Sequence, residues 1–323
     1  MKIVFHGANA STFYPGFAGL LDGQHELVLL PDNLESDADR IAYGMADVII
    51  GVKFDANCPE PQNLKLYQVP GAGYDGIELS RLPTNAFFCN CFGHEIAIAE
   101  YVMSALLSRH VPLADADARL RKGDWKYWAG GPSGLRTELG DTVIGILGYG
   151  HIGKAVARRA KAFGMQVHVT NRSRVEDPGL IDVFWSLERF RDMLPQVDVV
   201  VNTLPLAATT TGLVDDTAFA SLKQDAVFVN VGRGGVVDEA ALYDALSNHR
   251  IAHAFIDTWY RYPDKENPAP LPAAKPFHQL ANITMTPHMS GWTHGTIKRR
   301  RKAMADNVNL ISQGRDPLNG ISR

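Results

Sequence analysis

The sequence predicts an α/β protein built from two doubly wound parallel-sheet domains with a cleft between them. Short apolar strand-like runs alternate with helical segments along most of the chain, which is typical of parallel sheets. A glycine-rich loop at residues 148–153 joins one such run to a helix. The length of 323 residues is long for a single hydrophobic core and suits two domains.

The glycine-rich loop reads G-x-G-x-x-G between a strand and a helix, the context in which this motif binds dinucleotides. The first glycine allows a tight turn, the second lets a pyrophosphate approach the backbone, and the third lets the helix pack against the strand. The N-terminus of the helix offers free N–H groups and the positive end of its dipole to phosphates. The residues predicted to contact the cofactor here are Gly148, Tyr149, Gly150, His151, Ile152 and Gly153.

The remaining elements follow from apolar runs and turn residues. Strands are expected at residues 2–5, 26–30, 48–50, 66–69, 142–147, 166–170, 197–201, 226–231, 252–256 and 283–285. Helices are expected at residues 36–43, 94–110, 113–122, 154–163 and 293–311. We therefore expect residues 94–292 to form a Rossmann-like NAD(P)-binding domain. It is inserted into a smaller, flavodoxin-like substrate-binding domain made of residues 1–93 and 293–323.

The composition describes a soluble globular protein with 46% hydrophobic and 21% charged residues. Its net charge of −3 argues against a nucleic-acid partner. No apolar stretch is long enough to cross a membrane, and residues 1–5 read as a first strand and not as a signal peptide. The basic run at residues 298–302 is interpreted as a solvated helix face and not as a phosphate-binding patch.

The cysteines indicate a reducing compartment, so we expect a cytoplasmic protein. Their number is odd, and Cys58, Cys89 and Cys91 lack the spacing of a disulfide framework. Two of them and His94 could in principle approach a metal. No fourth ligand lies nearby, and buried free thiols are common, so no metal site is expected.

The end of the second strand of the nucleotide-binding unit predicts the cofactor. NAD sites carry an acid there that binds the ribose 2′-hydroxyl, but this strand ends in Asn171, Arg172, Ser173 and Arg174. Arg172 can stack on adenine and pair with a 2′-phosphate, and Ser173 can donate a hydrogen bond to it. The sequence therefore predicts that NADP(H) is preferred over NAD(H).

Three polar segments follow later strands, at residues 230–235, 257–263 and 286–291. Ligands of open parallel sheets bind outside the carboxyl ends of strands. Together with the glycine loop and the Leu-Pro-Leu turn at 204–206, these segments resemble the D-isomer-specific 2-hydroxyacid dehydrogenase family. The family includes glyoxylate/hydroxypyruvate reductases and phosphoglycerate, D-lactate, formate and phosphite dehydrogenases. The resemblance covers nearly the whole chain, from residues 71–75 to 316–319.

The resemblance implies roles for individual residues. Arg233 would bind the substrate carboxylate and polarise its carbonyl, and His288 would be the general acid–base. The N–H groups of Ala72 and Gly73 would form a second carboxylate clamp. Asp257 would lie near the nicotinamide, either accepting a hydrogen bond from its carboxamide or holding Arg233. Further cofactor contacts are expected from Leu204, Pro205, Val231, Gly232, His288 and Gly291, and we expect Lys53 and Trp292 to line the substrate pocket.

One position departs from the family. Most members carry a glutamate five residues after the acid matched by Asp257, directly before a proline, and this chain has Tyr262 there. The family glutamate orients the catalytic histidine and raises its pKa. A tyrosine could orient the ring by a hydrogen bond, but it could not stabilise an imidazolium equally well. Glu266 lies nearby, but its spacing and the prolines oppose shifting the match.

Several readings of this departure stay open. Keto-acid reduction could continue with His288 at a lower pKa and a rate that favours more acidic pH. Alternatively, the enzyme could resemble formate dehydrogenase, which has a neutral glutamine at this position. Residues 257–259 and 288–291 favour this alternative. However, His94 stands where formate dehydrogenases have an asparagine, and the sequence lacks their long N-terminal extension. We favour 2-hydroxyacid chemistry on a small-molecule acid. A phosphite-type enzyme and a nucleotide-sensing protein without turnover remain alternatives.

A homodimer is expected because relatives are usually two-fold symmetric. The apolar helix at residues 94–110 suits a subunit seam. Trp125 and Trp128 resemble aromatic residues that some relatives lend across the interface, although they could equally be packing residues.

Overall fold

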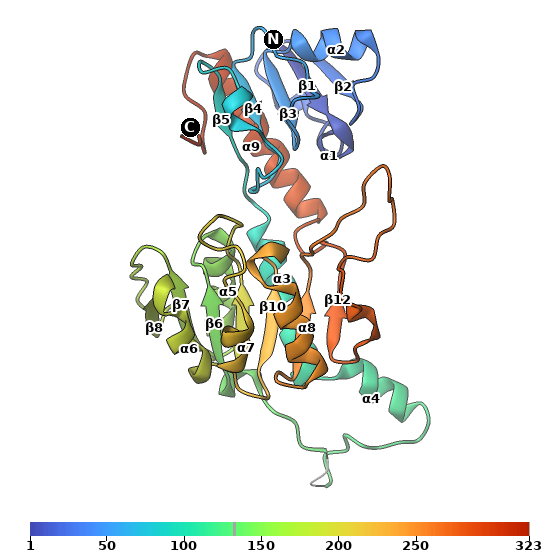
Figure 1. Ribbon diagram of the computed structural model, residues 1–323, viewed down its shortest axis with the longest axis vertical. Coiled ribbons are helices and arrows are strands. Elements are labelled where there is room, and N and C mark those ends of the chain that lie inside the picture. Colours follow the sequence, from blue (N-terminus) through green and yellow to red (C-terminus); the bar gives the residue numbers. More distant parts are fainter. Residues whose placement is uncertain (132–133, 323) are drawn as a thin grey trace. The chain divides into compact units, whose positions relative to one another are not determined.

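The computed structural model describes residues 1–131 and 134–322. The chain divides into two compact units, one made of Met1–Gly93 and Thr293–Arg323 and the other of His94–Trp292. Each unit is a parallel sheet covered by helices (Figure 1). The predicted fold class, two doubly wound parallel α/β domains, is therefore confirmed.

The first unit carries a five-stranded sheet in the order β2-β1-β3-β4-β5, with every pair parallel. Its strands are β1 (Lys2–His6), β2 (Glu26–Leu30), β3 (Val48–Gly51), β4 (Leu66–Gln68) and β5 (Phe87–Cys89). Ile3 and Phe5 pack with α1 (Gly7–Ser11) and α9 (His294–Ser312) on one face. Val4 faces the opposite core, which α2 (Asp37–Gly44) covers. The strands β1, β3 and β4 are largely buried on both faces, so they are mostly apolar and do not alternate regularly with polar residues.

The second unit has seven parallel strands in the order β12-β11-β10-β9-β6-β7-β8. The strands are β6 (Val143–Leu147), β7 (Gln166–Asn171), β8 (Val183–Ser186), β9 (Val199–Asn202), β10 (Val227–Asn230), β11 (His253–Ile256) and β12 (Ile283–Met285). The strand order reverses between β6 and β9, so the topological switch point lies at the carboxyl ends of these two neighbouring strands.

Helices cover both faces of this second sheet. The helices α3 (Glu95–His110) and α5 (His151–Ala162) pack together on one face. The opposite face is covered by α6 (Phe190–Met193), α7 (Asp216–Ala220) and α8 (Glu239–Ser247). The short helix α4 (Leu113–Leu120) and the segment after it extend away from the sheet (Figure 1).

Two short strands, β5 and β8, were not predicted. Both lie at the edge of their sheet, and β8 is only half-buried along its whole length. Edge strands pair on one side only, so they need no continuous apolar run, and periodicity does not reveal them. Helix α5 also starts at His151, three residues before its predicted start, because Gly150 is already its extended N-cap.

The interpretation of the basic run at residues 298–302 as a solvated helix face was wrong for its three arginines. Within the first unit, Arg300 is only 8% exposed, and Arg299 Nε donates to the carbonyl of Gly93 at 2.8 Å. Arg301 Nε donates to the carbonyl of Phe13 at 3.1 Å. Guanidinium groups are rigid multiple donors that can satisfy loop carbonyls, so a cationic run on a helix can face inward. Only the two lysines at the ends of the run are exposed.

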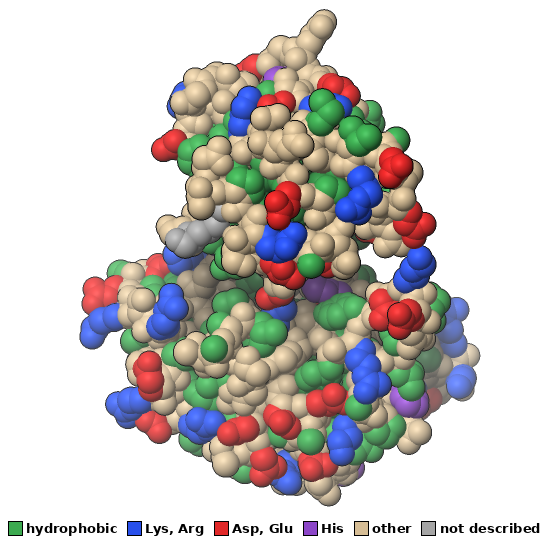
Figure 2. Space-filling view, turned by 45° about the horizontal axis from the view of Figure 1, so that its top comes forward, with side chains coloured by type: hydrophobic (Ala, Val, Ile, Leu, Met, Phe, Trp, Pro, Cys, Tyr) green, Lys and Arg blue, Asp and Glu red, His purple; other side chains and the backbone are tan. Residues whose placement is uncertain are grey.

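Cys58, Cys89 and Cys91 are all free and buried. None of the described helices is both long and apolar enough to cross a bilayer. Figure 2 shows acidic and basic side chains interspersed on the visible face, without a broad patch of one sign.

Candidate active site

The three loop glycines have different structural reasons to be glycine. Gly148 has φ of +94°, in the left-handed region that a side chain disfavours. A Cβ on Gly153 would lie 2.2 Å from the carbonyl oxygen of Gly148, so only glycine lets α5 approach β6 this closely. A Cβ on Gly150 would meet nothing within 4 Å, so this position is open on the side where a ligand can approach.

These features fit a pyrophosphate. The N-cap of α5 is Gly150, which has no side chain that could cap the first N–H groups of the helix. Uncapped N–H groups at a helix N-terminus, together with the dipole, form an anion site at the switch point of the sheet. The residues present therefore suit a dinucleotide cofactor, with Gly148, Gly150 and Gly153 shaping the cradle.

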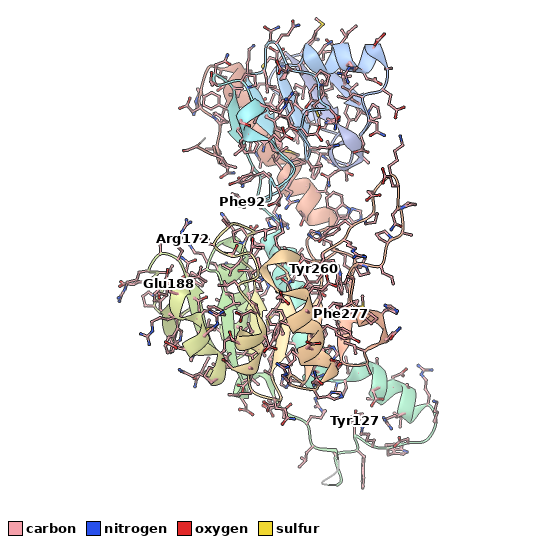
Figure 3. All side chains as sticks on the ribbon, viewed as in Figure 1. Phe92, Tyr127, Arg172, Glu188, Tyr260 and Phe277 are labelled. Carbon is pink, nitrogen blue, oxygen red and sulfur yellow. The ribbon has the colours of Figure 1, made fainter. Side chains whose placement is uncertain are left out.

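The loop after β7 carries the residues predicted to read the adenosine ribose. Asn171 Oδ1 accepts the amide hydrogen of Tyr149 at 3.3 Å, and its Nδ2 donates to the carbonyl of Ser173 at 2.9 Å. Arg174 pairs with Glu176 at 3.1 Å. The exposed side chain of Arg172 makes no ion pair or hydrogen bond within the described residues, and it lies on the loop that follows the strand (Figure 3). Of the two arginines, Arg172 is therefore the one available to a ligand.

Backbone packing fixes the position of Arg233. A Cβ on Gly232 would lie 2.7 Å from the carbonyl oxygen of Leu204, and one on Gly234 would lie 2.2 Å from that of Trp259. The turn is therefore wedged between the loops that follow β9 and β11. The half-buried Arg233 Nη1 also donates to the carbonyl of Gly232 at 2.9 Å.

Two buried amide side chains brace the same turn. Asn202 Nδ2 donates to Asn230 Oδ1 at 2.9 Å, and Asn202 Oδ1 accepts the amide hydrogen of Leu204 at 3.1 Å. Asn230 Nδ2 in turn donates to the carbonyl of Arg233 at 3.3 Å. In the sequence, Asn230 stands out only as part of a motif, and Asn202 was not predicted as a site residue. A buried asparagine at the end of an apolar strand was the available sign.

Asp257 organises the loop that carries His288. Its carboxylate is fully buried. Oδ1 accepts from Thr286 Oγ1 at 2.6 Å and from the amide of Met289 at 2.9 Å, while Oδ2 accepts from the amide of Ser290 at 3.0 Å. The sequence left two roles open for this acid, a contact with the nicotinamide or a contact with Arg233. The hydrogen bonds of the structure give it another role, which is to hold the residues on both sides of His288.

His288 itself adopts φ of +57°, which few residues other than glycine populate. Such a backbone conformation persists only where surrounding contacts over-determine it, and it is common at functional sites. The Asp257 bonds supply that constraint. The imidazole is exposed, so a ligand in the second unit can reach it.

Two aromatic residues missed by the sequence analysis complete this support. Tyr101 Oη lies 2.8 Å from Thr286 Oγ1, and Trp259 Nε1 donates to the carbonyl of Thr286 at 2.8 Å. Tyr101 comes from α3, which is far from Thr286 in sequence, so no local pattern could identify the pair.

Tyr262 contacts His288 through its ring. The two ring centroids are 5.5 Å apart, with the planes tilted by 49°. The tyrosine hydroxyl instead accepts the amide hydrogen of Trp259 at 3.1 Å. Burial raises the pKa of Tyr262, so the phenol stays neutral near neutral pH. The expected orienting hydrogen bond to the imidazole is therefore replaced by a ring contact.

The predicted substrate residues of the first unit lie on neighbouring loops. The exposed Lys53 pairs with Asp55 at 3.1 Å. The carbonyl of Ala72 accepts from Asn90 Nδ2 at 3.0 Å. No described residue accepts a hydrogen bond from the amides of Ala72 or Gly73. In the second unit, Trp292 is 45% exposed. The other predicted cofactor contacts are Leu204, Pro205, Val231, Gly232 and Gly291, on the loops after β9, β10 and β12.

Across residues 1–131 and 134–322, no group of three or more histidine, cysteine or acidic side chains could hold a metal ion.

We predict that Asp257→Ala lowers the free energy of unfolding by at least about 2 kcal/mol, because it leaves three donors without their acceptor. Denaturant unfolding measures this loss, with the exposed Asp225→Ala as the matched control. A loss no larger than that of the control would contradict the anchoring role.

Comparisons with known proteins agree with this geometry. The family model for the NAD-binding domain of D-isomer specific 2-hydroxyacid dehydrogenases matches residues 103–290. A glyoxylate reductase of Thermococcus kodakarensis is 31% identical over 87% of this chain and 82% of its own. A glyoxylate reductase of Korarchaeum cryptofilum is 28% identical over 89% of this chain and 83% of its own.

Solved structures agree as well. A family protein from Aeromonas salmonicida superposes with a TM-score of 0.80 at 25% identity, covering 99% of this chain and 98% of that one. The resemblance seen in the sequence motifs is therefore confirmed. The chain belongs to the D-isomer specific 2-hydroxyacid dehydrogenase family, whose members are NAD(P)-dependent oxidoreductases.

Proposed function

We propose that this protein is an NADP(H)-preferring reductase of small 2-keto acids of the glyoxylate or hydroxypyruvate kind. The observation that carries the proposal is the pair of braced loops that present Arg233 and His288 at the carboxyl edge of one sheet. The similarity to two glyoxylate reductases supports the substrate class. The three free cysteines agree with a cytoplasmic location, which is part of the proposal.

In the proposed mechanism, Arg233 binds the substrate carboxylate through its guanidinium fork. The amides of Ala72 and Gly73 provide a second clamp for the acid, and Lys53 and Trp292 line the pocket. When bound, the nicotinamide supplies the hydride that the carbonyl carbon receives. An N–H of the His288 imidazolium donates the proton to the carbonyl oxygen, leaving a neutral imidazole. In the oxidation of the hydroxy acid, the same ring takes the hydroxyl proton.

Tyr262 changes the acid–base balance of this mechanism. A neutral phenol ring beside His288 keeps the imidazole in place, but it brings no negative charge to stabilise the imidazolium. The neutral residue also favours one second candidate, a formate- or phosphite-type enzyme, since formate oxidation requires no proton abstraction from a hydroxyl.

One assay separates these functions. With NADPH and a panel of 2-keto acids that includes glyoxylate and hydroxypyruvate, we expect the absorbance of the reduced nicotinamide to fall. With NADP and formate or phosphite we expect no gain. A gain would support the second candidate, and tight cofactor binding with neither change would indicate a nucleotide-sensing protein.

The pH dependence of the same reaction tests the role of Tyr262. Keto-acid reduction is expected to become faster as the pH falls. Tyr262→Glu should shift the pH–rate profile toward higher pH by roughly one pH unit or more. Tyr262→Phe, which keeps the ring, is the control and should leave the profile in place. An unchanged profile in the glutamate variant would contradict the proposed coupling.

The cofactor preference depends on Arg172. We expect Arg172→Ala to lower kcat/KM for NADPH by about ten-fold or more, because it removes a charge-assisted hydrogen bond, while kcat/KM for NADH changes little. Arg174→Ala is the matched control, since that arginine is already paired with Glu176. A wild-type enzyme that clearly prefers NADH would contradict the proposal.

A homodimer completes the proposal. An apolar groove runs between α3, α4 and α5, with Met103, Leu107 and Val111 among its lining residues. Leu113, which is 73% exposed, also lines this groove, and the segment that extends from the same unit exposes Trp128 by 61%. Large exposed apolar residues next to an apolar groove on the same unit suit a two-fold interface, in which each copy covers the other. We therefore propose that a second copy of this chain covers the groove.

Leu113→Asp should therefore convert a dimer into a monomer, because it places a charge in an apolar interface. Sedimentation velocity measures the mass, and Leu318→Asp, which changes another exposed leucine, in the first unit, is the control. A monomeric wild-type protein would contradict the dimer.

A further inference from the structure

Tyr149, at the second position of the glycine loop, reaches out of that loop to an acid on another one. Its hydroxyl donates to Asp177 Oδ2 at 2.8 Å, and its side chain is only 3% exposed. Val175 and Ile181, which flank Asp177, pack against the same core that contains the tyrosine ring. The glycine loop and the loop after β7 are therefore joined by a side-chain bond as well as by their neighbouring strands.

The same tyrosine also holds the beginning of that loop. Its amide donates to Asn171 Oδ1 at 3.3 Å, and Asn171 Nδ2 donates to the carbonyl of Ser173 at 2.9 Å. One residue of the glycine loop thus contacts the segment at residue 171 and again at residue 177. Arg172 and Ser173 lie between these two points.

We propose that Tyr149 and Asp177 form a clamp that positions Arg172 and Ser173, and that this clamp determines selectivity for a cofactor with a 2′-phosphate. The inference rests on the proposed preference for NADP(H). It assigns a function to Asp177, which sequence motifs do not mark, and to the side chain of a motif position that is usually described only by its backbone.

The chemistry of the pair suits a clamp. A hydrogen bond to a carboxylate is stronger than one between neutral groups. Burial, followed by the bond to Asp177, raises the pKa of Tyr149, so the phenol remains protonated and keeps donating. The ammonium of Lys154 lies 5.8 Å from the centroid of the tyrosine ring and stabilises the same side chain. A segment fixed at two points loses less conformational entropy when it orders around a ligand.

Four variants test the clamp. Tyr149→Phe removes only the hydroxyl, Asp177→Ala removes the acceptor, and the double variant removes both. Asp177→Asn keeps an acceptor oxygen and is the conservative rescue. Tyr127→Phe is the matched control, because it breaks another tyrosine–aspartate bond, to Asp115 at 2.7 Å, on a segment far from the glycine loop (Figure 3).

Two measurements are made on each protein. Calorimetric titration with 2′,5′-ADP and with 5′-AMP isolates the contribution of the 2′-phosphate, since the two ligands differ only in that group. Hydrogen–deuterium exchange of residues 171–182 in the free protein reports the clamp without any ligand.

We expect Tyr149→Phe and Asp177→Ala each to weaken the binding of 2′,5′-ADP by about 3- to 10-fold and to leave the affinity for 5′-AMP unchanged. Both variants should also exchange amide hydrogens faster at residues 171–182. The double variant should lose no more than either single variant, because both remove the same bond. Asp177→Asn should stay near wild type, and Tyr127→Phe should match wild type.

The failures are distinguishable. Unchanged exchange in Tyr149→Phe would overturn the clamp. Faster exchange with an unchanged ratio of the affinities for 2′,5′-ADP and 5′-AMP would overturn its role in selectivity. Equal loss of affinity for both ligands would do the same. A wild-type protein that binds 2′,5′-ADP no more tightly than 5′-AMP would overturn the NADP(H) preference itself, and with it the selectivity role.

Discussion

The sheet edge of the second unit that carries Arg233 and His288 depends on one buried carboxylate. Asp257 accepts three hydrogen bonds from the residues on both sides of His288, and this lets that residue keep a backbone conformation it would rarely adopt alone. Trp259 extends the same support, because its indole donates to the carbonyl of Thr286 and its backbone packs against Gly234. The loops after β10, β11 and β12 are therefore joined by hydrogen bonds and close packing, and Arg233 and His288 both lie on them.

The nucleotide side of the same sheet uses backbone geometry more than side chains. Gly148 and Gly153 make the turn and the close helix contact possible, and Gly150 leaves open space where a phosphate can approach. In the proposed function, selectivity between cofactors comes from side chains of the loop after β7. Asn171 is bound on both sides, so the position of Arg172 is set by its neighbours and not by the arginine alone.

The first unit shows how a charged sequence can serve packing. Arg299 and Arg301 of α9 donate to loop carbonyls, while Asn307 Nδ2 donates to the buried Gln68 Oε1 at 2.8 Å. The Gln68 amide in turn donates to the carbonyls of Val69 and Asn90. Buried amide and guanidinium groups supply the donors that irregular loop backbone requires. This network supports the loop of Ala72 and Gly73.

In the second unit, Tyr262 has an aromatic ring at the position where the sequence comparison expects a carboxylate, and that ring contacts His288.

The sequence by itself determined the fold class, most of the strands, the glycine loop and the family, because these depend on local periodicity and on residues at short, fixed spacing. It also predicted Arg233 and His288 as candidate site residues, since each lies in a compact motif. Only the tertiary structure revealed the three-donor role of Asp257, the pairing of Tyr101 with Thr286 and of Tyr149 with Asp177, and the inward side of the basic run. These contacts join residues from different strands and helices, and a carboxylate or guanidinium looks the same in a sequence whether it faces solvent or a buried donor or acceptor.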